Sequence, residues 1–361
     1  MKKNFLFRLS AIAMSLILVA CGGSTSEDVV ENETTAIESE ESLNVVVTTP
    51  MLGEFVKQVA GDSVVLDILM PAEADPHTYD PSPQDAAKIA DADIVLYVGI
   101  KYETSSLLKL IENTASTNAT LLEIGEEIDP IEFKDGERDH GHHDDHDEDG
   151  HDDHDEEGHD DDKDHDHDDE DGHDEEGHEG HDHGSEDPHF WFDPVRVAMA
   201  VEVIKDSLVS LDPANSSTYE ANADNFISEL TDLDAQVKEL IESVSEDNRK
   251  IVTTHEALGY LEARYGIEIF ATIIPSLSTA DEISPSQIAD VIDVIEDNNI
   301  KVLFVESEAP SVYAETVVAE AGITAVTGLY VETLKDGQTY SDFLISNVTL
   351  IVESLNSAGE G

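Results

Sequence analysis

Short apolar runs rich in β-branched residues recur in the first third of the chain and alternate with stretches that have helical periodicity. The strand-like runs cover residues 43–49, 64–69, 93–98 and 120–124. The helical stretches cover residues 51–60, 83–91 and 104–113. This alternation predicts a parallel sheet with helices packed on its faces.

The same alternation returns in the last third of the chain. Strand-like runs cover residues 250–254, 268–272, 302–305 and 324–327, and helices are expected near residues 256–265, 285–297, 312–321 and 338–355. Between the two regions lie helical stretches at residues 194–210 and about 214–246, the second strongly polar and preceded by Asp212 and Pro213. The pattern predicts an α/β fold of two lobes, each with a parallel sheet flanked by helices, joined by one long helix.

The N-terminus has the features of an export signal. Three basic residues come first, an apolar run follows at residues 9–20, and Cys21, the one cysteine of the chain, comes directly after it. The run is shorter than the roughly 20 residues needed to span a bilayer. We therefore expect a lipoprotein signal peptide at residues 1–20, a lipid on Cys21, and an acidic flexible tether at residues 21–42.

The remaining chain of about 340 residues exceeds what one hydrophobic core usually supports. We expect an N-terminal lobe at residues 43–213, a connecting helix at 214–247 and a C-terminal lobe at 248–361. Because no later segment is long and apolar enough to span a membrane, everything after Cys21 should be extracytoplasmic, either in the periplasm or on the outer face of the cell membrane.

Residues 134–187 consist almost only of Asp, Glu, His and Gly, and we expect this insert to be disordered without metal. The chain has a net charge of −65, which argues against nucleic acid and points towards cations. Acids alone would keep such a segment solvated, so its interspersed histidines favour auxiliary metal capture. These histidines are His140, His142, His143, His146, His151, His154, His159, His165, His167, His173, His178, His181 and His183.

Outside the insert only three of the 16 histidines remain, His77, His189 and His255. His77 follows the second strand-like run, and His255 follows the first run of the C-terminal lobe. In open α/β sheets ligands bind beyond the carboxyl ends of the strands, so both should face the crevice between the lobes. His189 lies where the insert gives way to a helix. The three imidazoles predict a transition-metal site.

Zinc prefers four nitrogen, sulfur or oxygen ligands, so a fourth ligand is expected. No cysteine is available for it, which leaves a carboxylate. Glu332 follows an apolar segment and begins a loop, and Glu306 ends a strand-like run. The spacing does not choose between these two residues. Metal binding needs neutral imidazoles, so the affinity should fall as the pH drops through roughly 6.5.

Several segments, in order, resemble the metal-binding substrate-binding lipoproteins of ABC importers for zinc and manganese. They are His77-Thr78-Tyr79-Asp80-Pro81, Gly99 to Glu103, His189 to Pro194, His255-Glu256-Ala257-Leu258-Gly259-Tyr260 and Leu329-Tyr330-Val331-Glu332-Thr333-Leu334. The resemblance implies that the helix between the lobes is rigid. It also implies that His77 and His189 from the first lobe and His255 and Glu332 from the second bind one metal.

In that family, manganese-selective members tend to carry a carboxylate where this chain has His255, so the resemblance favours Zn²⁺ over Mn²⁺. The family more often has Asp at the position of Glu332, and a disulfide found in the second lobe of some zinc members cannot form here. The implied partners are an ABC permease with its ATPase and, through Cys21, the membrane. We expect a monomer that is not an enzyme.

Three alternatives remain beside zinc uptake. One is a manganese-binding member of the same family. Another is a surface metal-storage or adhesion lipoprotein that acts through the insert. The third is a zinc hydrolase with Glu256 as general base, which is disfavoured because the second histidine of an H-E-x-x-H motif would have to replace Gly259.

Overall fold

The computed structural model describes residues 42–133, 186–308 and 312–359. The predicted signal peptide, Cys21, nearly all of the tether and the thirteen histidines of the insert lie outside the described residues. Within the described ranges no helix is both long and apolar enough to cross a membrane.

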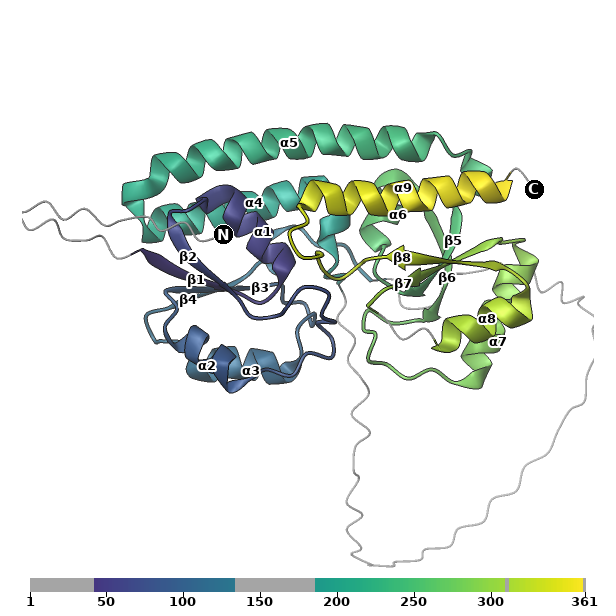
Figure 1. The fold of residues 1–361 in the computed structure, drawn as a ribbon, viewed down its shortest axis with the longest axis horizontal. Coiled ribbons are helices and arrows are strands. Elements are labelled where there is room, and N and C mark those ends of the chain that lie inside the picture. The colour runs from purple at the N-terminus through teal and green to yellow at the C-terminus, as the bar shows by residue number, and fades with distance from the viewer. Residues whose placement is uncertain (1–41, 134–185, 309–311, 360–361) are drawn as a thin grey trace, which may run out of the picture. The chain divides into compact units, whose positions relative to one another are not determined.

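Two four-stranded sheets, each entirely parallel, form the centres of two lobes (Figure 1). The first sheet has the order β2-β1-β3-β4, and the second has the order β6-β5-β7-β8. The strands are β1 Leu43–Val47, β2 Val64–Ile68, β3 Ile94–Tyr97, β4 Thr120–Glu123, β5 Lys250–His255, β6 Glu268–Ile274, β7 Val302–Glu306 and β8 Thr324–Leu329. The predicted fold class, two α/β lobes with parallel sheets, is confirmed.

Helices cover both faces of each sheet. They are α1 Pro50–Ala60, α2 Pro83–Ala90, α3 Ser105–Thr114, α4 Pro194–Leu211, α5 Ser216–Glu242, α6 Gly259–Tyr265, α7 Pro285–Asp297, α8 Val312–Ala321 and α9 Tyr340–Gly359. In β1, Val45 and Val47 face the core under α1 and α4, and Val46 faces α2 and α3. A strand segment buried on both faces has no polar side, which explains the continuous apolar run at residues 45–47.

Several helix starts follow from local sequence. Ser82 caps α2 and Ser284 caps α7, each in a capping box with the residue three positions later, and a proline occupies the first turn of both helices. Asp193 caps α4 by accepting a hydrogen bond from the backbone N–H of Val195 at 2.9 Å. These signals explain why the helix positions could be predicted closely.

Helix ends differ from the sequence expectation by up to four residues, and two of the helices illustrate the cause. The helix expected from residue 256 begins at Gly259, because the backbone N–H of Glu256 donates to the carbonyl of Ser276 at 3.0 Å and holds residues 256–258 in a loop. The long polar stretch forms α5 and is preceded by a separate 3₁₀ turn at Pro213–Asn215. Both differences concern the ends of helices, where tertiary contacts compete with periodicity.

The two sheets share one continuous hydrophobic core on the face covered by α1, α4, α5 and α9. α5 packs along α1 and α4 of the first lobe and along α9 of the second (Figure 1). The ring of Phe55 in α1 lies 5.4 Å from that of Tyr340 in α9, and the ring of Phe192 lies 5.7 Å from that of Phe343. The lobes are therefore held by side-chain packing as well as by the connecting helix.

Candidate metal centre

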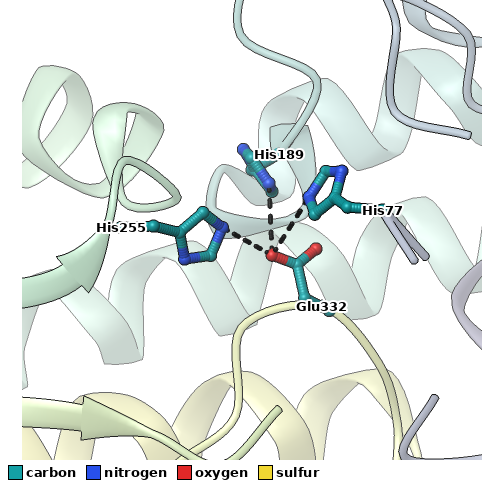
Figure 2. A group of neighbouring side chains, drawn as sticks. All are labelled: His77, His189, His255 and Glu332. Atoms are coloured by element: carbon teal, nitrogen blue, oxygen red, sulfur yellow. Dashed lines mark ion pairs between the residues drawn. The ribbon is translucent and has the colours of Figure 1, made fainter. Parts of the chain in front are cut away.

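Four polar side chains from four separate segments meet between the loops of the two lobes (Figure 2). His77 lies in the loop between β2 and α2, and His189 directly precedes the 3₁₀ turn Phe190–Phe192. His255 is the last residue of β5, and Glu332 lies in the loop after β8. Both parallel sheets direct the carboxyl ends of their strands to this place, as expected for a binding site of an open α/β sheet.

The carboxylate of Glu332 points at the Nε2 atoms of all three histidines (Figure 2). Its Oε1 lies 3.6 Å from Nε2 of His77, 3.4 Å from Nε2 of His189 and 2.7 Å from Nε2 of His255. The donor atoms of the four residues all lie within 4.8 Å of one another. Three imidazole nitrogens and a carboxylate oxygen at this spacing are a donor set that a tetrahedral zinc ion can use.

The cluster is buried, and its facing atoms have no partner outside the cluster. His189, His255 and Glu332 are fully buried, and His77 is 9% exposed. Among the described residues, the three Nε2 atoms and both carboxylate oxygens of Glu332 have no hydrogen-bond partner. Buried polar groups are almost always hydrogen-bonded or bound to a metal, because leaving one unpaired costs about 1–3 kcal/mol. Five such atoms facing one point indicate a cation site.

Two further carboxylates orient the rings from behind. Oδ1 of Asp187 lies 2.8 Å from Nδ1 of His189, and Glu306 contacts Nδ1 of His255. A carboxylate at Nδ1 keeps the proton on that nitrogen and leaves the Nε2 lone pair free for a metal. The alternative fourth ligand, Glu306, is therefore placed on the far side of the His255 ring. Its carboxylate also accepts the backbone N–H groups of Thr254 and His255, at 3.2 and 3.1 Å.

The charges of the cluster shift its proton equilibria. Burial lowers the pKa of His189, but the negative charges of Glu332 and Asp187 outweigh it and raise the pKa to about 9. The pKa of His255 is raised in the same way, with burial opposed by Glu306 and Glu332. Burial raises the pKa of Glu332, but His189 and His77 hold it well below its usual value. Without metal, His189 and His255 retain protons well above the pH of 6.5 expected from unperturbed histidine.

Tyr102 is a site residue to which the sequence assigned no role. Its hydroxyl donates to the backbone carbonyl of Glu332 at 2.9 Å, and its ring lies edge-on to His77 with centroids 5.2 Å apart. The preceding residues 99–101 have positive φ angles of 78°, 50° and 60°. The buried carboxylate of Glu103 stabilises this turn by accepting two backbone N–H groups from residues 98 and 99. The segment resembled the family, but only the tertiary contact shows its purpose.

A pocket of about 420 Å³ adjoins the cluster on the His77 side. One wall comes from the first lobe, at residues 100–105, and the other from residues 276–278 of the second. Asp75 precedes the lining residue His77 by two positions. Its Oδ1 accepts the backbone N–H of His77 at 2.9 Å, and its Oδ2 accepts the hydroxyl of Thr279 from the second lobe at 2.6 Å. The pocket therefore adjoins the cluster, and Thr279, which follows the lining residue Ser278, makes a hydrogen bond between the lobes to Asp75.

Solved structures share this fold. The periplasmic zinc-binding protein TroA from Treponema pallidum superimposes with a TM-score of 0.68 and 22% sequence identity, covering 86% of this chain and 98% of that one. A manganese-bound periplasmic metal-binding protein from Candidatus Liberibacter asiaticus gives a TM-score of 0.66 and 23% identity over the same shares. These likenesses show that the fold of two α/β lobes with parallel sheets is shared.

Sequence relatives span nearly the whole chain. The manganese-binding lipoprotein MntA of Halalkalibacterium halodurans is 25% identical, covering 98% of this chain and 99% of its own length. The iron ABC transporter substrate-binding lipoprotein MtsA of Streptococcus pyogenes serotype M1 is 26% identical over the same shares.

The model of the ZnuA family, described as zinc-uptake complex component A, periplasmic, matches residues 45–354, and the chain belongs to this family. This membership confirms the resemblance seen in the sequence. It also agrees with the predicted extracytoplasmic location, since the family is described as periplasmic and the relatives are named lipoproteins.

Proposed function

We propose that this protein is the extracytoplasmic substrate-binding component of an ABC importer that binds one Zn²⁺ and delivers it to a permease with its ATPase. His77, His189, His255 and Glu332 are the proposed ligands. The relatives named as substrate-binding lipoproteins of ABC transporters support the transport role. Cys21 is the proposed site of the lipid that attaches the protein to the membrane.

The observation that carries this proposal is the set of five buried atoms that face one another at the cluster and have no hydrogen-bond partner among the described residues. A purely structural polar cluster would be expected to satisfy its own hydrogen bonds. The two carboxylates at the Nδ1 atoms support it, because they hold His189 and His255 in the tautomer that a metal requires.

Zinc is the preferred cargo because imidazole nitrogen suits zinc, whereas manganese favours oxygen ligands. The cluster offers three nitrogens and one carboxylate. Manganese is the second candidate, and it is supported by the names of relatives such as the manganese-binding lipoprotein of Halalkalibacterium halodurans. The description of the ZnuA family supports zinc.

Release is proposed to occur by local rearrangement rather than by wide hinge opening. The lobes share a continuous core, and separating them would expose large buried side chains such as Phe55 and Tyr340. His255 at the end of β5 and Glu332 in the loop after β8 can move locally at lower cost, because such a movement leaves the shared core packed. In this scheme the insert, residues 134–187, collects metal and raises its concentration near the cluster.

The hydrolase alternative loses support from the geometry. A catalytic zinc keeps a position open for water, whereas Glu332 lies 2.7 Å from Nε2 of His255 and offers a fourth ligand. Glu256, the residue that would act as general base, accepts the hydroxyl of Thr272 at 3.0 Å. Deletion of the insert is the experiment that distinguishes the metal-storage alternative from the importer.

The test is calorimetric titration of chain that starts after the tether and lacks the insert, with zinc and with manganese in competition. One tight zinc per chain, weakened at least 100-fold by His255→Ala and unchanged by Glu262→Ala, is expected. Glu262 is a suitable control because it lies in α6 of the same lobe and binds the backbone N–H of Ile269. Tighter binding of manganese would favour the second candidate, and no tight site without the insert would favour metal storage.

A further inference from the structure

Asp187 holds the backbone and the ring of His189 in position. Its Oδ1 accepts the backbone N–H of His189 at 2.9 Å and lies 2.8 Å from Nδ1 of the same residue. Its own backbone N–H donates to the carbonyl of Ile131 at 3.0 Å. Asp187 is 3% exposed. A displacement of Asp187 would therefore turn the imidazole of His189 away from the other donors.

Asp187 also lies at the point where the chain leaves the first lobe for the insert and returns from it. Residues 131–132 and 186–187 form a short antiparallel stem, in which Glu132 bridges Glu186 and Ile131 accepts from Asp187. The segment between the two sides of the stem comprises residues 133–185. Any pull on that segment acts first on the stem, and Asp187 is part of it.

The second lobe holds the stem through Tyr260. The hydroxyl of Tyr260 donates to the carbonyl of Asp187 at 2.9 Å and accepts the backbone N–H of Ile131 at 3.2 Å, so one phenol bridges both sides of the stem. Tyr260 is 1% exposed and belongs to α6, which begins four residues after His255. The same tyrosine therefore connects the support of His189 to the segment that carries His255.

The neighbouring glycine makes this contact possible. A Cβ atom at Gly259 would lie 2.5 Å from Oδ2 of Asp187, closer than real contacts allow. A side chain at this position would force either the Asp187 carboxylate or α6 to shift. This explains physically why the histidine-glutamate pair at residues 255–256 is followed by glycine where a zincin has its second histidine.

We propose that Tyr260 is a positioning residue that fixes the stem, so that the geometry of His189 and His255 does not depend on the insert. The inference rests on the proposed function, because it assigns a role in the binding of metal by the cluster. Tyr260 does not itself touch the metal ligands' donor atoms. It acts through Asp187, whose carboxylate orients His189.

The experiment compares Tyr260→Phe with Tyr265→Phe in the full chain and in chain whose residues 134–185 are replaced by a short glycine-serine linker. Tyr265 is a matched control, since it lies in the same helix and also donates to an aspartate, Asp234 at 2.7 Å, away from the cluster. Zinc affinity is measured by competition with a chromophoric chelator. The apo melting temperature of each variant is recorded alongside it.

The wild-type chain and Tyr265→Phe should keep the zinc affinity of the cluster within about threefold when the insert is removed. In the full chain Tyr260→Phe should weaken the affinity by about 10–100-fold, the usual effect of losing an outer-shell partner. In the Tyr260→Phe variant, replacing the insert by the linker should restore most of the lost zinc affinity. A merely structural role would lower the affinity equally with and without the insert.

Equal losses in both backgrounds, or a Tyr260→Phe affinity within threefold of wild type in the full chain, would overturn the inference. Gly259→Ala provides a second variant: its Cβ would displace the Asp187 carboxylate directly, so the affinity should fall in both backgrounds, and an unchanged affinity would overturn the link from Asp187 to His189. Absence of a tight zinc site in the wild-type chain without the insert would instead refute the proposed function, whatever the tyrosine variants show.

Discussion

Replacing Glu306 by glutamine tests whether a residue that touches no proposed donor atom controls the metal site. In the native chain the Glu306 carboxylate accepts from Nδ1 of His255 and from the backbone N–H groups of Thr254 and His255. Glutamine has nearly the same shape and keeps one acceptor oxygen for the backbone. Its second group is an NH₂, which can only donate.

The amide NH₂ facing Nδ1 reverses the proton arrangement of the ring. A neutral His255 would then accept at Nδ1 and carry its proton on Nε2, the atom that lies 2.7 Å from Glu332. That tautomer cannot bind a metal through Nε2. We expect an affinity loss of about 10–100-fold, equal to about 1.4–2.7 kcal/mol, since this is the usual cost of changing an outer-shell partner.

The assay is zinc competition calorimetry at pH 7.5 on the insert-deleted chain, with circular dichroism to verify the fold. Glu262→Gln is the control, because it makes the same chemical change in the same lobe on a carboxylate that accepts the backbone N–H of Ile269 and belongs to none of the proposed ligands. It should bind zinc as the wild type does. A Glu306→Gln affinity within twofold of wild type would refute the tautomer argument.

Three further predictions follow from the cluster and the contacts between lobes. The pKa of His189, about 9 in the folded apo chain, exceeds the unfolded value, so its contribution to stability is full below pH 6.5 and is lost as the pH rises through 9. The melting temperature of the apo chain should therefore fall over this interval, whereas zinc-saturated chain should show no such fall; a flat apo profile would contradict this. Thr279→Val removes the hydrogen bond to Asp75 beside the pocket and should speed zinc dissociation by about 5–10-fold in stopped-flow chelator exchange, with unchanged rates as the refuting outcome. Arg264→Met breaks the two-pronged ion pair with Asp234, at 2.7 and 2.9 Å, and should lower the free energy of unfolding by about 1–2 kcal/mol in urea titrations; a change below about 0.3 kcal/mol would count against it.

Much of the fold could be predicted from the sequence because its signals are local. The strands around Val45 and Leu303 are apolar on both faces, which is typical of parallel sheets. The caps at Ser82 and Ser284 mark helix starts with short-range hydrogen bonds. The start of α6 was predicted three residues too early, because the loop at Glu256 is held by Ser276, which is distant in the sequence.

The candidate site also depends partly on local sequence signals and partly on contacts between distant residues. His77 and His255 could be selected because each follows an apolar strand, and parallel topology brings such positions to one edge. The choice between Glu306 and Glu332 stayed open. Only the register of β7 and β8 and the path of the following loop turn Glu332 towards the three Nε2 atoms.

The sequence by itself determined the alternation of strands and helices, the three histidines available for a site and the resemblance to metal-transport lipoproteins. The tertiary structure decided which atoms face one another: the unpaired Nε2 atoms, the carboxylates at Nδ1, and the contact of Tyr260 with Asp187. Periodicity and helix caps depend on neighbouring residues and can therefore be predicted from the sequence. Contacts such as that between Tyr102 and Glu332 join residues 230 positions apart, and they exist only once both lobes have packed on a common core.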